Sequence, residues 1–287
     1  MSDLGAGYEN VLPFTFRAGT SEEIERHSSY MKKGLTGSTL KIIAMVAMLI
    51  DHIGAAVCFR MMARAGYSDL NGATEETIVA WVTANADLYS TYYIFRMIGR
   101  IAFPIFAFLL VEGFLHTQDV KKYAIRLFMF ALLSEIPFDL AFQGKVLEFT
   151  HQNVFFTLAI GFVTMMVYKW IEEKQFQNTF TRYLLQILVM MAGMAVAQFL
   201  RTDYSALGVF AILSIYIFRN NKLFQIAAIG LVFIENMSAW FAFFPILLYN
   251  GKRGLNVKWV FYAFYPVHLL VLYGICCLMG LGAIPAI

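Results

Sequence analysis

Residues 96–112 read RMIGRIAFPIFAFLLVE, an apolar run that begins with two arginines and ends with a glutamate. Arg96 and Arg100 lie four residues apart, so a helix places both guanidinium groups on one face. Pro104 follows four residues later, and because its ring displaces the helical hydrogen bond to the Arg100 carbonyl, we expect a kink there. Charged groups at membrane depth cost about 2.5–3.5 kcal/mol each on insertion scales, so these residues are rarely incidental.

A second apolar segment follows and ends in Ser134-Glu135-Ile-Pro-Phe-Asp139. Glu135 and Asp139 share a helix face. In an antiparallel hairpin of the two segments, Arg100 lies near the depth of Glu135, and Arg96 then lies near that of Asp139. The arginines therefore have two interpretations that do not exclude each other. They hold the hairpin together as ion pairs, or at least one faces a polar cavity and binds an anion with bidentate geometry.

The composition indicates a polytopic membrane protein. Hydrophobic residues make up 60% and charged residues 14% of the 287 residues, against about 25% charged residues in soluble domains. Apolar runs of roughly 17–25 residues, the length that crosses the hydrocarbon core as a helix, recur along the chain. We expect an all-α membrane helical bundle with about nine transmembrane helices, within a range of about eight to ten.

The apolar segments predict where these helices lie. Their approximate ranges are about 40–62, 91–116, 121–142, 153–170, 183–200, 205–218, 223–235, 238–249 and 258–280. Residues 65–90 are expected to form a polar, acidic loop. Residues 1–38 form a polar cytoplasmic segment without the apolar region of a signal peptide, and residues 39–282 form the transmembrane domain.

Basic residues set the expected orientation of the bundle. They recur at the ends that the predicted topology places on one side, namely Lys32, Lys33, Lys41, Lys121, Lys122, Lys169, Lys174, Arg182, Arg219, Lys222, Lys252, Arg253 and Lys258. The other side holds the acidic loop with scattered Lys145 and Arg201. By the positive-inside rule we expect a cytoplasmic N-terminus.

Of the five histidines, His52 and His268 lie in the middle of predicted helices, and no soluble-enzyme motif accompanies them. His52 and His268 each lie about ten to twelve residues from the cytoplasmic end, or roughly 15–18 Å at 1.5 Å per residue. Imidazole at that depth can act as a general base, or it can form a hydrogen bond between helices for packing. Asp51 diverges from His52 by roughly 100° around a helix. We therefore expect Asp51 to meet an arginine of another helix.

Several motifs, taken in order, resemble the TraX family, which is named for the membrane enzyme that N-acetylates conjugative pilin subunits. They cover roughly residues 39–270. The motifs are Leu49-Ile-Asp51-His52-Ile-Gly54, Gly99-Arg100-Ile-Ala-Phe-Pro104, Ser134-Glu135-Ile-Pro-Phe-Asp139, Asn153-Val-Phe-Phe-Thr157, Asp203-Tyr204…Gly208, Tyr249-Asn250-Gly251 and Tyr265-Pro266…His268. The family is similar to a wider group of transmembrane acyltransferases, which includes the acyltransferase-3 and heparan glucosaminide acetyltransferase types.

The resemblance implies a multi-pass acyltransferase of the bacterial cytoplasmic (inner) membrane. Its donor would be acetyl-CoA or another short-chain acyl-CoA that enters from the cytoplasm, and no metal is expected. The acceptor would be an amine or hydroxyl of a protein N-terminus, a lipid, a sugar or a small amine. The lipid bilayer is the other expected partner, and nucleic acid is not one.

The resemblance also suggests roles for individual residues. His52 matches the first-helix histidine that acts as base in the acyltransferase-3 group, and whether Asp51 or His268 assists it stays open. Acyl transfer also needs donors for the developing oxyanion and cations for the CoA phosphates. The candidates for the thioester oxygen are Arg96, Arg100, Asn153 and Tyr265. The candidates for the nucleotide end are Lys121, Lys122, Arg126, Lys252 and Arg253.

Two other classes of function fit the buried charges. A transporter of an organic anion would bind it with Arg96 and Arg100 and relay protons through Glu112 or His52, although the inverted repeat that favours such a protein is not evident. A membrane scaffold would use the same charges as structural pairs. A continuous tunnel that is lined by His52 and opens to the basic side favours the enzyme, whereas tight pairs without a cavity favour the scaffold.

Overall fold

The computed structural model describes residues 34–255 and 258–286, and within them it contains helices and no strand. The first helical stretch is continuous and consists of α2 (Gly37–His52), a π-helical segment (Ile53–Cys58) and α3 (Phe59–Arg64). The remaining helices are α4 (Glu75–Ala84), α5 (Ala86–Gly99), α6 (Ala102–His116), α7 (Val120–Gln143), α8 (Val154–Glu173), α9 (Thr179–Phe199), α10 (Ser205–Ile217), α11 (Lys222–Val232), α12 (Phe243–Leu247) and α13 (Lys258–Leu278). Short 3-10 helices cover Tyr67–Leu70 and Met237–Ala242. The expected all-α fold is confirmed, and each predicted apolar segment contains a helix.

Five helical stretches in the described residues are long and apolar enough to cross a membrane. They are Gly37–Arg64, Ala86–His116, Val154–Glu173, Thr179–Phe199 and Trp259–Leu278. Three further apolar stretches are shorter, with bounds Ser205–Ile217, Lys222–Val232 and Met237–Leu247. These helices indicate a membrane protein. The count of about nine spans and the cytoplasmic N-terminus stay predictions, and residues 1–33 of the expected polar segment lie outside the described part.

The stretch of residues 86–116 is interrupted near the arginine pair, as Pro104 predicts. Helix α5 ends at Gly99 and α6 begins at Ala102. Because Pro104 has no N–H, the Arg100 carbonyl lacks its helical donor and the chain turns at that point.

The expected polar loop over residues 65–90 is helical for much of its length, which corrects that expectation. Thr74 caps the N-terminus of α4, since its hydroxyl accepts a hydrogen bond from the Thr77 N–H at 3.4 Å. The Trp81 indole donates a hydrogen bond to the Ala65 carbonyl at 2.7 Å and ties α4 back to the end of α3. The sequence Thr74-Glu75-Glu76 is typical of such a helix start, because threonine is a favoured N-cap and acidic residues stabilise the first turn.

The predicted hairpin pairing of arginines with Glu135 and Asp139 is wrong. Helix α7 packs on α8 and α13 rather than on α6. Its carboxylates hold the chain that leads into α8: Asp139 Oδ2 accepts a hydrogen bond from the Glu148 N–H at 2.8 Å, and Glu135 accepts one from the Asn153 side chain. Similar depth in the membrane did not make these residues neighbours.

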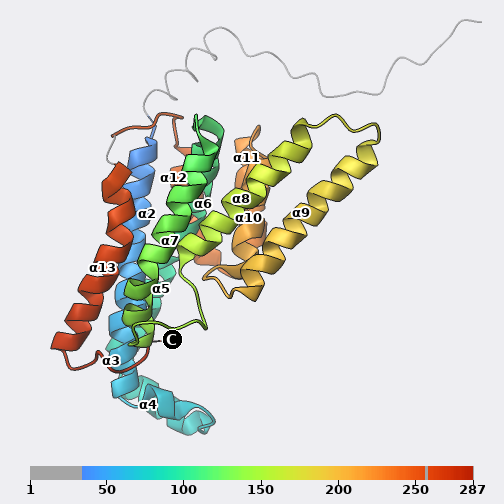
Figure 1. The fold of residues 1–287 in the computed structure, drawn as a ribbon. Helices are drawn as coiled ribbons and strands as arrows, with labels where there is room; N and C mark the ends of the chain where they lie inside the picture. The colour runs from blue at the N-terminus through green and yellow to red at the C-terminus, as the bar shows by residue number, and fades with distance from the viewer. Residues whose placement is uncertain (1–33, 256–257, 287) are drawn as a thin grey trace, which may run out of the picture. The chain divides into compact units, whose positions relative to one another are not determined.

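Helix α2 begins at one end of the bundle, and α4 lies at the other (Figure 1). At the start of α2, the Gly37 N–H donates a hydrogen bond to the Lys252 carbonyl at 2.8 Å, and the loop after α12 wraps the first turn of that helix. At the other end, beside α4, the Ala286 N–H donates to the Phe142 carbonyl at 2.6 Å. The fully buried Arg60 also reaches there and donates to the Ile284 carbonyl at 2.6 Å. These contacts attach the start of α2 and the C-terminal residues to the bundle.

Candidate functional site

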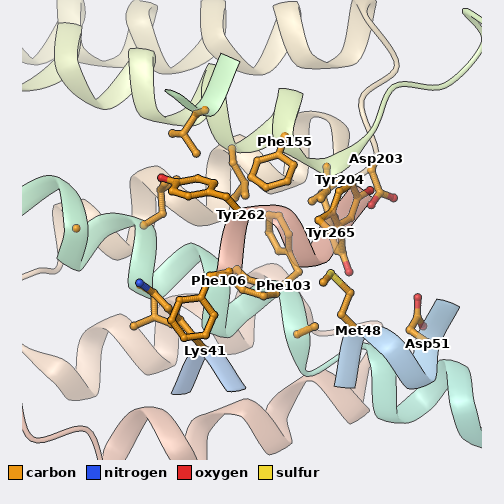
Figure 2. A pocket seen from close by; sticks show the side chains of 18 of the residues that line it. Lys41, Met48, Asp51, Phe103, Phe106, Phe155, Asp203, Tyr204, Tyr262 and Tyr265 are labelled. Atoms are coloured by element: carbon orange, nitrogen blue, oxygen red, sulfur yellow. The ribbon is translucent and has the colours of Figure 1, made fainter. Parts of the chain in front are cut away.

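A cavity of about 1140 Å³ lies between α2, α5, α6, α7, α8 and α13. One face of the first helical stretch lines it from Gly37 to Phe59, a length of about 33 Å at 1.5 Å per residue. Figure 2 shows Lys41 and Tyr262 toward one end and Asp51 and Asp203 toward the other, with aromatic rings between them. The cavity therefore extends along much of the thickness that a bilayer core would have.

The basic end of the cavity gathers cations from four elements. Lys41 comes from α2, Lys122 and Arg126 from α7, and Arg253 from the loop after α12. Arg126 is half-buried, and its guanidinium lies 5.4 Å from the centre of the Tyr123 ring. Because guanidinium and ammonium groups bind phosphate well, this end can accept a phosphorylated ligand.

His52 and His268 form a hydrogen-bonded pair at the other end. The distance from His52 Nδ1 to His268 Nε2 is 2.6 Å, and both side chains are buried. His52 is the last residue of α2, directly before the π-helical segment, and it lines the cavity. The edges of the Phe142 and Tyr265 rings lie against His52, with ring centres 5.4 and 6.0 Å from its own. The pair thus joins α2 to α13 in an aromatic enclosure.

Asp51 faces away from this pair and binds Arg96 of α5, which confirms the predicted partner. Arg96 Nη1 lies 2.5 Å from Asp51 Oδ2, and the two side chains are 26% and 18% exposed. Gly99 permits this approach, since a Cβ at that position would overlap the Asp51 side chain. Gly54 likewise lets α5 come close, because a Cβ there would lie 3.0 Å from Phe95 Cβ.

Arg100 is the second guanidinium on the cavity wall. Among the described residues, no carboxylate lies within ion-pair distance of it, in contrast to Arg96. Arg100 nevertheless lies in the field of Asp51 and of Asp203. Of the two arginines, Arg100 is therefore the one available for an anionic group in the cavity.

Asp203 and Tyr204 complete this end of the cavity, and our sequence analysis did not assign them to the site. The Asp203 side chain is exposed to the cavity, where partial loss of hydration and the neighbouring Asp51 carboxylate raise the pKa of Asp203 to about 6. The Tyr204 ring stacks on Phe103, with ring centres 3.7 Å apart. The signal available in the sequence was the Asp203-Tyr204 motif itself, a polar pair between two apolar helices.

The turn that carries Asp203 is fixed by several hydrogen bonds. The Thr157 hydroxyl donates to the Thr202 hydroxyl at 2.9 Å, and the Ser205 N–H donates to the Thr202 carbonyl at 2.8 Å. Arg201 and Ser205 have φ values of 51° and 48°, a left-handed backbone that residues other than glycine seldom adopt. This framework holds the Asp203 carboxylate at the cavity wall.

The other predicted site residues fall into two groups. Arg96, Arg100, Lys122, Arg126, Arg253 and Tyr265 line the cavity together with Asp51 and His52. Asn153, Lys121, Lys252 and His268 are not on its wall. Glu112 and His116, which the sequence left outside the catalytic set, lie at the basic end of the wall.

Asn153 has a structural environment. It is fully buried, its Oδ1 accepts a hydrogen bond from the Phe155 N–H at 3.0 Å, and its Nδ2 donates to the Ala131 carbonyl at 2.8 Å and to Glu135. It caps α8 and binds that helix to α7. The cavity site described here therefore does not include Asn153.

Comparison with known proteins gives one family and one similar curated protein. A family model described as "TraX protein" matches residues 36–276. The chain is also similar to a protein of Dichelobacter nodosus named "Probable fimbrial assembly protein FimC, serogroup H1", with 26% identity over 264 residues, which cover 81% of this chain and 92% of that protein. No solved structure matches. The family match extends from the turn before α2 into α13 and so includes both histidines of the pair.

Proposed function

The chain belongs to the TraX family, and from that membership we propose that it is an integral membrane acyltransferase. It moves an acetyl or other short acyl group from a cytoplasmic acyl-CoA to an amine or hydroxyl acceptor. The observation that carries the proposal is a single cavity with cations at one end and His52 at the other. The name of the similar fimbrial assembly protein directs the search for the acceptor toward pilin-like subunits.

The donor fits the cavity by length and by charge. Lys41 and His52 lie eleven residues apart on α2, which corresponds to about 16 Å of helix. Acyl-CoA carries phosphates at one end and a thioester at the other, joined by an extended pantetheine arm. With the phosphates among Lys41, Lys122, Arg126 and Arg253, the arm runs along the aromatic wall and the thioester reaches His52.

His52 acts as the general base in this proposal. Its imidazole takes the proton from the acceptor N–H or O–H, the acceptor atom bonds to the thioester carbonyl carbon, and the C–S bond breaks. The leaving CoA thiolate then receives the proton from the imidazolium, so the products are the acylated acceptor and CoA thiol. Direct transfer of this kind requires no nucleophilic cysteine.

The oxyanion of the tetrahedral intermediate needs a donor in the same region. Arg100 fits this role better than Arg96, because the Arg96 guanidinium is already bound to Asp51. Tyr265 is a second donor on the cavity wall, and its ring edge lies against His52. Donors that are held in place before the reaction stabilise developing charge without reorganisation.

Binding and hydrolysis of acetyl-CoA by the purified protein in detergent test the proposal. We expect the wild type to bind acetyl-CoA and to hydrolyse it slowly, and His52→Ala to bind it without turnover. Lys121→Gln, which removes an exposed charge of α7 that is not on the cavity wall, is the control and should retain both properties. If no variant binds any acyl-CoA, the proposal fails. Flux of organic anions into vesicles that depends on Arg100 would then favour the transporter.

A further inference from the structure

We infer that His268 is a positioning residue that holds His52 in the tautomer with the proton on Nδ1 and the lone pair on Nε2. The role in catalysis rests on the proposed function, whereas the tautomer follows from the geometry of the hydrogen bonds. His268 does not line the cavity and so acts only through His52. The chain of contacts runs from the Phe264 carbonyl to His268 and from there to His52.

The first link fixes the proton of His268. Its Nδ1 lies 2.7 Å from the Phe264 carbonyl oxygen, one turn earlier in α13. A carbonyl oxygen can only accept, so Nδ1 of His268 carries the hydrogen. In a neutral imidazole the other nitrogen is then an acceptor, which leaves the lone pair of His268 on Nε2.

The second hydrogen bond, between His268 and His52, determines which nitrogen of His52 carries the proton. His52 Nδ1 lies 2.6 Å from His268 Nε2, and the two ring planes are parallel to within 5°. An N–H bond lies in the plane of its ring, so nearly parallel planes suit a direct hydrogen bond. Because Nε2 of His268 accepts, Nδ1 of His52 donates. Nε2 of His52 is then unprotonated, as a general base requires.

The backbone of α13, through the Phe264 carbonyl and the adjacent Tyr265 carbonyl, sets this order of protons. Asp51, the residue next to His52, directs its carboxylate to Arg96. The neighbours of the pair are aromatic: Phe264 stacks on His268 with ring centres 4.7 Å apart, and Phe142 and Tyr265 contact His52 by their edges. The site therefore uses a second imidazole anchored to backbone where other acyl-transfer sites use a carboxylate to orient the base.

The same pair can share the proton that the reaction releases. When His52 Nε2 takes a proton from the acceptor, the proton on His52 Nδ1 can transfer within the hydrogen bond to His268 Nε2, since the two nitrogens are 2.6 Å apart. The positive charge then lies on either ring, and the hydrogen bond to the Phe264 carbonyl remains in both states. When the proton on His52 Nε2 passes to the leaving thiolate, the reverse shift from His268 Nε2 restores the proton on His52 Nδ1.

Histidine tautomers can be read by NMR without any assay of activity. The chain has five histidines, so a sample labelled with ¹⁵N-histidine in lipid nanodiscs gives few signals, and His52→Gln assigns those of His52. We expect His52 as the Nδ1–H tautomer in the wild type and in His268→Gln, whose side-chain oxygen can still accept. In His268→Leu, which has no acceptor, we expect Nε2–H or a mixture.

The outcomes separate this inference from the proposed function. An Nε2–H tautomer of His52 in the wild type overturns the inference, as does a folded His268→Leu variant in which His52 stays fully Nδ1–H. If His268→Leu does not fold, the wild-type tautomer alone decides. If acetyl-CoA is hydrolysed, His268→Leu should lower kcat by about 100-fold or more with little change in KM, since acid–base catalysis contributes about 10²–10⁴-fold, and His268→Gln should recover much of that loss. A protein with Nδ1–H His52 that ignores acyl-CoA disproves the proposed function only.

Discussion

Arg96 of α5 forms an ion pair with Asp51 of α2 at 2.5 Å, and Asp51 directly precedes His52, the candidate base. The pair draws the Asp51 carboxylate to one side of α2, and His52 projects to the other side toward α13. The ion pair and the histidine pair therefore attach the same turn of α2 to two different helices. This double attachment suits a site in which the imidazole must keep one orientation.

Gly99→Ala should destabilise the protein by about 1–3 kcal/mol, the usual cost of overpacking. The new Cβ would overlap the Asp51 side chain and force α5 away from α2. Thermal unfolding in detergent measures the effect. Gly274→Ala is the matched control, because a Cβ at Gly274 in α13 meets nothing within 4 Å, and it should leave the Tm unchanged or slightly higher. Equal effects of the two substitutions would contradict the packing described here.

Asp203→Asn should change stability in a way that depends on pH. Loss of hydration at the cavity wall and the Asp51 carboxylate raise the pKa of Asp203 from 3.8 to about 6 in the folded protein. The folded state then binds more protons than the unfolded state between these values, so this group makes the wild type less stable as pH rises through that window. The variant removes the penalty, and its Tm relative to wild type should rise from acid to neutral pH.

Thermal unfolding of wild type and Asp203→Asn in nanodiscs at about pH 4.5 and about pH 8 makes the comparison. Asp69→Asn, which alters a carboxylate away from the cavity wall, serves as the control for the loss of a carboxylate elsewhere in the protein. A pH-independent difference for Asp203→Asn would show that its carboxylate ionises as it does in the unfolded chain.

The sequence predicted the helices and part of the site because both depend on local patterns. Pro104 marks the break between α5 and α6 through its missing N–H. The divergence of Asp51 from His52 around the helix implied a partner on another helix, which is Arg96. Such inferences need only the geometry of one helix.

Contacts between helices that are distant in sequence could not be predicted in the same way. Depth alone suggested that Arg100 lies beside Glu135, yet α7 packs on α8 and α13, and Glu135 binds Asn153. The hydrogen bond between His52 and His268 joins residues 216 positions apart, which a pattern along one chain does not encode. Arg60 was missed because one arginine near the end of an apolar helix has the same pattern as a topology-setting charge.

Arg60→Met should loosen the C-terminal end of the chain. The buried guanidinium donates to the carbonyls of Ile284 and Ala141, and to that of Leu140 at 3.3 Å. Each buried carbonyl left without a donor costs about 1–3 kcal/mol. We expect a lower Tm and faster removal of C-terminal residues by carboxypeptidase, followed by intact mass.

Arg64→Met is the matched control for this prediction. Arg64 lies one turn further along α3, is exposed and donates one hydrogen bond, to the Met279 carbonyl at 3.3 Å. Digestion of this variant should proceed at the wild-type rate. If Arg60→Met is as resistant as Arg64→Met, the C-terminal residues are held by other contacts.

Arg126→Gln should raise the KM for acetyl-CoA by about 10-fold or more and leave kcat nearly unchanged. Arg126 lines the basic end of the cavity, and a charge-assisted hydrogen bond to phosphate contributes about 1.5–3 kcal/mol. The phosphates lie far from the reacting carbon, so the contact is the same in the ground state and the transition state and affects KM alone. Lys121→Gln, which removes an exposed charge from the first turn of α7 but not from the cavity wall, should change neither constant.

Acetyl-pantetheine separates a phosphate contact from a general weakening of the site, because it has the same thioester and arm but lacks the nucleotide and its phosphates. For this donor, wild type and Arg126→Gln should react with the same kcat/KM, whereas for acetyl-CoA they should differ by about 10-fold or more. If Arg126→Gln loses the same factor with both donors, its guanidinium supports the fold of the cavity around Tyr123 and does not bind the nucleotide. If kcat/KM of Arg126→Gln falls only with acetyl-CoA, the phosphates lie at the basic end of the cavity and the thioester extends toward His52.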